Sequence, residues 1–303
     1  MRNLHKEITD RIVARLETGV APWRKPWSTR RTVGETMLTL PRNALTGKPY
    51  SGINILLLWG KSDDCGFTNS RWLTFRQAKS VGASVRKGEK GTEIVFVSSV
   101  TREDRNDPTK LVRIPFLKSY YVFNVAQVDN LPAKYLASSD ALQPVVTSAD
   151  RNETVDAFVA ATNATIQHGG DRAFFTTGGD YVQMPPFAAF DSADAYYSTL
   201  FHELGHWTGG PARLNRTFGK RFADRAYAVE ELVAELSSAF VCAEFGIDMA
   251  DAPVAYIANW LSAIKADDKI LVAAASAASK AVEFMRNVVS AEDEDADELA
   301  IAA

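Results

Sequence analysis

Apolar side chains recur at helical spacing along several stretches of the chain. Leu4 to Glu17 forms an amphipathic, charged pattern, and Ser51 to Leu58 and Ala149 to Thr162 repeat the same period. Further on, Ala193 to Phe201 and Ala228 to Phe245 place apolar residues at helical positions again. We therefore expect helices in both halves of the chain.

Two other stretches, Thr92 to Val100 and Pro115 to Val125, are rich in β-branched and aromatic residues, which favours strands. The predicted fold class is α+β, with an N-terminal α+β domain at residues 1–135 and a second domain at residues 145–289. Pro, Ala and Ser mark the boundary between Leu131 and Gln143. The acidic stretch 290–303 has few apolar residues, and we expect a disordered tail there.

The composition is that of a soluble globular protein, with 46% hydrophobic and 23% charged residues. No apolar run has the character of a signal peptide or the length of a transmembrane helix. Cys65 and Cys242 fall one in each half and form no C-x-x-C motif, which indicates a reduced, cytoplasmic protein.

The net charge of -3 hides an asymmetry between the two halves. Residues 1–135 hold 23 Lys and Arg against 12 Asp and Glu, a net charge of +11, whereas the rest of the chain holds 11 against 25. The basic half is therefore expected to attract a polyanion.

The strongest chemical signal is the segment His202-Glu203-Leu204-Gly205-His206, near the end of a predicted helix. Histidines at i and i+4 share one face of a helix and can hold a single metal ion. Glu203 between them can take a proton from a water activated there. The motif predicts a zinc hydrolase centre, with another divalent ion such as Mn²⁺ as the alternative.

A catalytic zinc needs a third protein ligand and an open position for water. Glu231 and Glu235 are four residues apart on the next predicted helix and share a face, so one can ligate while the other orients a ligand histidine. We expect Glu231 to ligate and Glu235 to orient, and the reverse assignment stays open. Glu230 is expected to be a solvated acid near the helix start.

Aromatic and basic residues interleave in the N-terminal half. The expected contacts with nucleic acid are Trp23, Arg24, Lys25, Trp27, Arg71, Trp72, Arg76, Arg86, Lys87 and Lys90. A cationic groove with aromatic faces binds single-stranded DNA (ssDNA), and no reading helix for duplex DNA stands out. The competing interpretation is that the tryptophans are core residues and that the cations solvate the surface or face an acidic protein.

Several motifs in both halves, in the same order, carry a resemblance to a known family. APWRKPW, NALTGKPYSGIN, RWLTFRQAKSVGASVRKGEKGTEIVF and YYVFNVAQVDNLP resemble the ssDNA-binding domain of the ArdC antirestriction family and the related TraC-type plasmid primases. GDYVQMPPFAAFDSADAYYSTLFHELGHWTGGPARLNR, followed by EELVAELSSAF, is similar to the zincin-like metallopeptidase domain joined to it there. The matches span most of residues 5–246.

The resemblance implies a bacterial, plasmid-borne or phage-related protein that binds ssDNA and protects incoming DNA from host restriction during conjugation. It implies a mainly helical C-terminal domain with a small sheet, in which His202, His206 and Glu231 hold the metal and Glu203 is the general base. It also makes residues 178–185 (GGDYVQMP) a strand that borders the cleft and aligns a peptide, with Tyr181 as a substrate or oxyanion contact.

Two functions fit these features. In the first, ssDNA binding delivers a metallopeptidase to a protein substrate or restriction-system component. In the second, the metal site is structural, and a non-catalytic ssDNA-binding protein occludes DNA or a restriction enzyme. Glu203 favours the first function, because a structural zinc site closes its fourth position and has no use for a general base.

Overall fold

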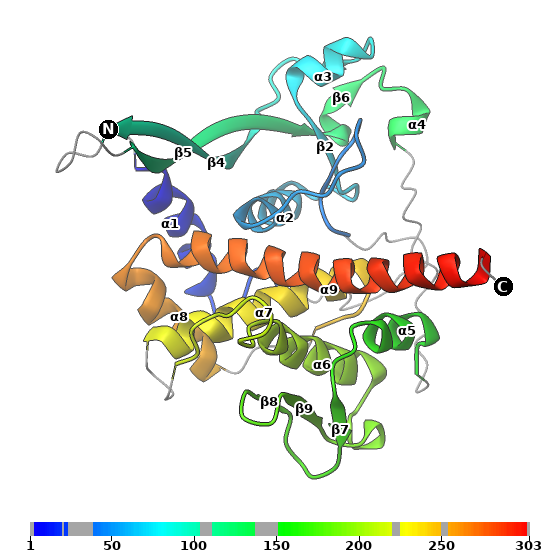
Figure 1. Ribbon diagram of the computed structural model, residues 1–303. Helices are drawn as coiled ribbons and strands as arrows, with labels where there is room; N and C mark the ends of the chain where they lie inside the picture. The colour runs from blue at the N-terminus through cyan, green and yellow to red at the C-terminus, as the bar shows by residue number, and fades with distance from the viewer. Residues whose placement is uncertain are drawn as a thin grey trace.

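The computed structural model describes residues 3–19, 21–23, 39–103, 111–136, 151–219, 225–249 and 254–301 (Figure 1). The first half contains α1 (Leu4–Leu16), β1 (Arg42–Asn43), α2 (Ile53–Cys65), β2 (Arg71–Leu73), α3 (Phe75–Ser80), β3 (Ser84–Val85), β4 (Thr92–Glu103), β5 (Leu111–Asn124), β6 (Val128–Asp129) and α4 (Ala133–Leu136). The second half contains α5 (Glu153–Ala161), β7 (Ile166–His168), β8 (Phe174–Thr176), β9 (Tyr181–Met184), α6 (Ala193–Thr208), α7 (Arg225–Phe245), α8 (Val254–Ala266) and α9 (Ile270–Ile301). The α+β class is confirmed, and the expected helices and strands are present, although α2 and α6 each extend seven residues beyond the expected stretches that end at Leu58 and Phe201.

The N-terminal half is built on a four-stranded sheet in the order β1-β2-β5-β4, in which β4 and β5 form a long antiparallel hairpin. Helix α2 lies between this sheet and α9 (Figure 1). The side-chain amide of Asn54 in α2 donates to the Val95 carbonyl and accepts from the Val95 N–H, each at 2.8 Å. These two bonds fix the helix against the backbone of β4, because a buried amide with unmet partners would be costly.

The C-terminal half stacks α6, α7 and α9, and a three-stranded sheet lies on the outer side of α6 (Figure 1). The strand order is β7-β9-β8, with β9 parallel to β7 and antiparallel to β8. The expectation that residues 178–185 supply a strand able to pair with a peptide is therefore wrong. β9 is the central strand and its backbone is paired on both sides, so the edges belong to β7 and β8.

One hydrophobic core runs through both halves of the chain. Ile8, Ile12 and Leu16 of α1 are buried in the same cluster as Trp260 of α8 and Ala278 of α9. Helix α1 packs against α8 and α9, and α2 packs against α9. The two predicted domains therefore share this cluster, while two smaller clusters, around Leu73 and around Trp72, lie wholly within residues 1–135.

The acidic stretch at the C-terminus differs from its prediction. Backbone helix continues through this stretch to Ile301, as the end of α9 (Figure 1). Ala, Glu and Leu are strong helix formers and outweigh the local charge here. Within the described ranges, no helix combines the length and hydropathy that a bilayer crossing requires.

Candidate metal centre

Helix α6 presents its two histidines on one face. Ser192 caps the helix, with its Oγ accepting from the Ala195 N–H at 3.1 Å, and the helix runs unbroken to Thr208. The rings of His202 and His206 are one turn apart, with centroids separated by 4.9 Å. Both side chains stay partly open to solvent, at 20% and 12% exposure, so small molecules can reach them.

Gly205 lets the neighbouring helix come close enough to complete the site. A Cβ atom at position 205 would lie 3.2 Å from the Ala234 carbonyl oxygen and 3.3 Å from the Ser237 Cβ. Contacts this short are rarely tolerated in a packed interior. Helices α6 and α7 therefore approach through a glycine, and this approach brings the glutamates of α7 to the histidines of α6.

Glu231 faces both imidazoles. Its Oε2 lies 3.5 Å from the His202 Nε2, and its Oε1 lies 3.5 Å from the His206 Nε2. One ligand atom from each of these three residues falls within 4.8 Å of the others. Two imidazole nitrogens and a carboxylate oxygen around one point are a donor set that suits a divalent metal ion such as Zn²⁺. The sequence pattern had singled out the same three residues.

Glu203 lies on α6 between the two histidines and is buried. It is the acid that sequence reasoning made the general base, and its position next to the metal-binding face is compatible with that role.

A second carboxylate stands behind His206. The Oε1 of Glu230 lies 3.2 Å from the His206 Nδ1, and Arg216 donates to both oxygens of Glu230 at 2.7 and 2.9 Å. Arg216 also donates to the Gly205 carbonyl at 2.7 Å, so it ties the carboxylate to the end of α6. The expectation that Glu230 is a solvated acid is wrong, because α7 begins at Arg225 and Glu230 lies in its buried second turn.

Glu235 stands behind His202 in a similar way. Its Oε2 lies 3.7 Å from the His202 Nδ1, which is buried and has no hydrogen-bond partner among the described residues. Its Oε1 accepts from the Trp23 indole N–H at 3.0 Å. Glu235 therefore lies on the side of the His202 ring away from Glu231, as expected of a residue that orients this histidine.

The surrounding carboxylates set the charge of the site. Burial disfavours the imidazolium of His202, but Glu231 and Glu235 outweigh this effect and raise its pKa to about 10. The same balance raises the pKa of His206, through Glu230 and Glu231. The two histidines in turn hold the pKa of Glu231 far below its usual value, despite burial. Without a metal the site thus keeps protons on its imidazoles, and a bound cation would replace them.

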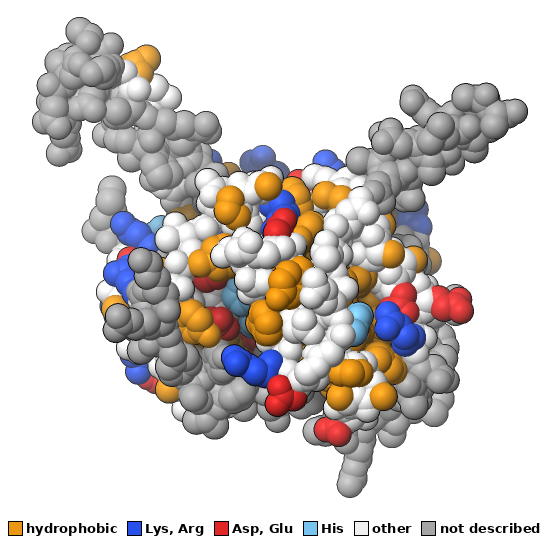
Figure 2. Space-filling model, turned by 60° about the horizontal axis from the view of Figure 1, so that its bottom comes forward, with side chains coloured by type: hydrophobic (Ala, Val, Ile, Leu, Met, Phe, Trp, Pro, Cys, Tyr) orange, Lys and Arg blue, Asp and Glu red, His pale blue; other side chains and the backbone are white. Residues whose placement is uncertain are grey.

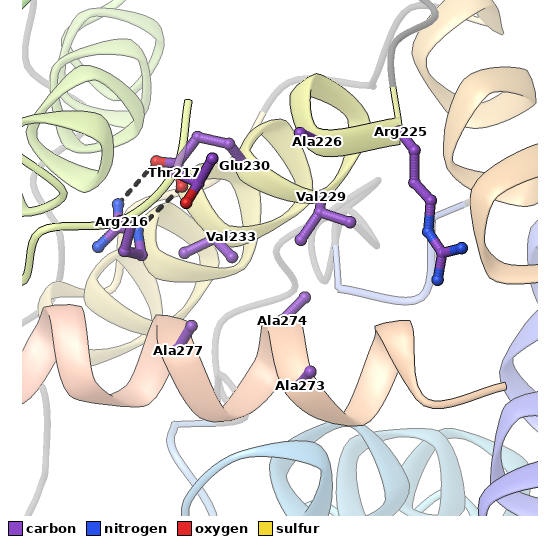
Figure 3. A pocket seen from close by; sticks show the side chains of 10 residues that line it. All are labelled: Arg216, Thr217, Arg225, Ala226, Val229, Glu230, Val233, Ala273, Ala274 and Ala277. Carbon is purple, nitrogen blue, oxygen red and sulfur yellow. Dashed lines mark hydrogen bonds and ion pairs between the residues drawn. The ribbon is translucent and has the colours of Figure 1, made fainter. Parts of the chain in front are cut away.

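A cavity of about 550 Å³ lies on the other side of this network, between α7 and α9 (Figure 3). Glu230 and Arg216 border it, and Val229, Val233 and Ala277 contribute to its apolar wall. On the outer face of the molecule, histidine and acidic atoms are visible in recesses between hydrophobic ones (Figure 2). The metal-binding histidines are thus partly exposed, and the buried ion pair of Arg216 and Glu230 supports His206 from behind.

Tyr181 begins β9, and its ring centroid lies 6.4 Å from that of Phe174 in β8. Its role as a substrate or oxyanion contact stays a prediction. The edge strand β8 is linked to the metal face through Phe218, whose ring lies 6.0 Å from Phe175 and 6.3 Å from His206.

The predicted nucleic-acid contacts separate into three groups. Arg24, Lys25 and Trp27 lie outside the described residues. Arg71, Trp72 and Trp23 are buried, with both tryptophan rings at 3% exposure or less, so these two rings offer no face to a base. Arg76, Arg86, Lys87 and Lys90 are exposed. Of these, Arg86 is engaged with Glu89 at 2.9 Å and Asp129 at 3.6 Å.

The β4–β5 hairpin carries exposed aromatic residues that were not among the predicted nucleic-acid contacts. Phe96 in β4 is 51% exposed and Tyr120 in β5 is 41% exposed, with centroids 5.3 Å apart. Lys118 is paired with Phe96 in the register, and its Nζ lies 5.5 Å from the Tyr120 ring. Phe116 is also exposed, and the alternation of Phe116, Lys118 and Tyr120 along β5 is the sequence signal that predicts one shared face.

Comparisons with known proteins cover both halves. Residues 2–123 match the N-terminal domain of the anti-restriction factor ArdC, and residues 153–277 match a zincin-like metallopeptidase. The Sinorhizobium fredii protein y4eC is 36% identical over 294 residues, which cover 93% of this chain and 91% of that protein. A DNA primase TraC of Escherichia coli is 36% identical over 299 residues, but the match spans only 27% of that primase.

Two solved structures have the same fold. The antirestriction ArdC protein from plasmid R388 superposes in its metal-free form with a TM-score of 0.78 at 41% identity, and in its Mn(II)-bound form with 0.77 at 39%. Each match covers 95% of this chain and 98% of the other. The zincin-like fold and the Mn(II)-bound relative indicate a divalent-metal site. The chain belongs to the ArdC antirestriction family, as an ArdC-type N-terminal domain joined to a zincin-like metallopeptidase domain.

Proposed function

We propose that this protein is a metal-dependent peptidase whose N-terminal half binds ssDNA, and that it protects incoming DNA from restriction. The observation that carries the peptidase is the convergence of the His202 and His206 Nε2 atoms on the carboxylate of Glu231. Glu203 from the same helix supplies an acid that a purely structural site would not need.

The residues of the metal centre have two roles, metal binding and proton transfer. His202, His206 and Glu231 would hold a divalent ion, and a bound ion would supply polarisation of a substrate carbonyl and activation of water. Glu203 accepts the proton of the attacking water and passes it to the leaving amine. Glu230 and Glu235 orient the two imidazoles from behind, which keeps the Nε2 atoms directed at Glu231, where an ion would be held.

The peptide substrate lies along the open edge of β8, where main-chain pairing would align it. This placement is supported by the topology, because β8 is paired with β9 on one side only among the described residues. It is also supported by the contact of β8 with α6 and by the aromatic link through Phe218 to His206. Tyr181 contacts the substrate from the neighbouring strand.

The ssDNA surface is the exposed face of the β4–β5 hairpin together with the exposed cations of α3 and of the turn after β3. Phe96, Phe116 and Tyr120 offer open rings for base stacking, and Lys118 offers a charge for the backbone. The net charge of +11 over residues 1–135 supports a polyanionic ligand. The match to part of a DNA primase is consistent with this ligand.

The peptidase is tested by Glu203→Gln beside the paired change of His202 and His206 to Ala. We expect Glu203→Gln to keep about one divalent ion per chain and to lose peptidase activity by about 10² to 10⁴, whereas the histidine variant loses the ion. Activity is read on candidate host proteins with and without ssDNA, and protection is read in a conjugation assay. Full protection by Glu203→Gln would favour the non-catalytic protein that occludes DNA or a restriction enzyme.

A further inference from the structure

Trp23 belongs to the N-terminal half but is buried beside the metal centre of the C-terminal half. Its ring is 3% exposed, and its centroid lies 5.7 Å from that of Trp260 in α8. The indole N–H donates to the Oε1 of Glu235 at 3.0 Å, across 212 residues of sequence. Glu235 is itself 0% exposed, so this hydrogen bond lies in the protein interior, where it is strongest.

The other oxygen of Glu235 is directed at a metal-binding histidine. Oε2 lies 3.7 Å from the His202 Nδ1, while the His202 Nε2 faces Glu231 on the opposite side of the ring. A carboxylate behind a ligand histidine fixes its tautomer and its orientation when it accepts from the second ring nitrogen. The distance of 3.7 Å is slightly too long for a hydrogen bond, and Nδ1 has no such partner among the described residues.

We propose that Trp23 is a positioning residue for His202 and that it acts through Glu235. The indole holds Oε1 and thereby keeps Oε2 directed at Nδ1. This inference rests on the proposed metal site. It makes the metal centre dependent on the segment that precedes the basic residues Arg24 and Lys25, so that the N-terminal half completes the site of the C-terminal half.

The arrangement around His206 supports this interpretation. Glu230 stands behind His206 as Glu235 stands behind His202, and each carboxylate is held by an N–H donor. For Glu230 the donor is Arg216 of the same half, at 2.7 and 2.9 Å. For Glu235 the donor comes from the other half of the chain. A merely space-filling tryptophan would not need its N–H aimed at this particular carboxylate.

The test compares Trp23→Phe with Trp59→Phe in the full chain. Trp59 is also buried and its indole N–H also donates to an oxygen, that of Thr39 at 3.2 Å, but it makes no contact with the carboxylates of the metal centre among the described residues. Both variants are expected to lower the melting temperature. Only Trp23→Phe is expected to weaken Zn²⁺ or Mn²⁺ binding, by about 10-fold, in chelator-competition or calorimetric titrations.

A double-mutant cycle with Glu235→Gln shows whether the effect passes through Glu235. We expect Glu235→Gln to weaken metal binding and Trp23→Phe to add little in that background. If Trp23→Phe does not fold, 3-benzothienylalanine at position 23 keeps the ring shape and removes only the donor. Unchanged metal affinity in the variant that folds, an equal loss in Trp59→Phe, or additive losses in the cycle would overturn the proposal.

The two levels of inference fail in different ways. If the wild-type protein binds no stoichiometric metal, or still binds it after both histidines are changed to Ala, the proposed metal site itself is wrong. If the histidine variant loses the metal and Trp23→Phe does not weaken it, only the positioning role is wrong.

Discussion

Gly205 lies so close to Ala234 that a Cβ atom at position 205 would stand 3.0 Å from the Ala234 Cα. The neighbouring helix therefore determines which residue can stand directly before the second histidine, His206. Any side chain there would push α6 away from α7 and separate the histidines from Glu231.

We expect Gly205→Ala to lower the free energy of unfolding by about 1 to 3 kcal/mol, because overpacking forces the backbone to shift. Metal affinity should fall as well. Gly60→Ala in α2 is the control, since a Cβ there would meet the Arg15 side chain at an ordinary 3.6 Å. Alanine favours helix over glycine, so the control is expected to be neutral or stabilising. Equal behaviour of the two variants in thermal unfolding would contradict the close approach as the cause.

Glu230→Gln removes the charge that Arg216 and His206 share. We expect metal affinity to fall by about 10- to 100-fold, because the His206 ring loses the carboxylate that orients it. Glu244→Gln is the matched control, because Glu244 lies on the same helix and pairs with Arg286 away from the site. If both variants bind the metal with the affinity of the wild-type protein, Glu230 does not orient His206 for metal binding.

Metal binding should depend on pH with a definite sign. Because the pKa of His202 is raised to about 10, its imidazole is protonated at neutral pH and a metal ion must displace that proton. Metal affinity is therefore expected to rise as the pH increases from 6.5 toward 8.5, within the range below this pKa. Calorimetric titration in buffers of different ionisation enthalpy counts the protons released. A titration that releases none would rule out the protonated state.

The contributions of charge and of base stacking to ssDNA affinity can be separated by mutation. Changing Arg76, Lys87 and Lys90 to Gln is expected to flatten the log-log dependence of affinity on salt by about 0.7 for each phosphate contact that is lost. Phe96→Ala or Tyr120→Ala is expected to weaken binding by about 1 to 3 kcal/mol for each stacked base and to leave the slope unchanged. Lys280→Gln, at an exposed position of α9, serves as the control. Fluorescence anisotropy measures the affinity for ssDNA and for duplex DNA of equal length. Equal affinity for both would contradict an ssDNA surface.

The parts of the site that sequence could predict are those set within one helix. His202, Glu203 and His206 lie on a single stretch of α6, so their spacing alone defines the geometry. The helical spacing of Glu231 and Glu235 also predicts that both face the histidines, but it leaves open which of the two ligates. The sequence did not predict the role of Glu230. The rotation of α7 against α6 determines whether Glu230 or Glu231 faces the His206 Nδ1, and this rotation is set by long-range packing.

Long-range packing also explains the errors in the N-terminal half. Trp23 and Trp72 looked like stacking residues because they lie among cations, yet both rings are buried. A tryptophan beside arginine is compatible with either a surface or a core position, and only the tertiary structure decides. The order of β7, β9 and β8 was likewise beyond local pattern, because pairing across the sheet determines which strand lies at the edge.

The burial of α1 against α8 and α9 also limits where recombination can divide the gene. A recombination event that cut the gene between the codons for residues 136 and 151 would leave Ile8, Ile12 and Leu16 facing water on one product. On the other product, α8 and α9 would lose their contacts with α1 and α2. Each fragment would expose this shared part of the interior, while the smaller clusters around Leu73 and Trp72 would stay intact in the first product. The match of 299 residues inside the much longer TraC primase spans both halves of the chain, so the two halves that share this interior occur together there as well.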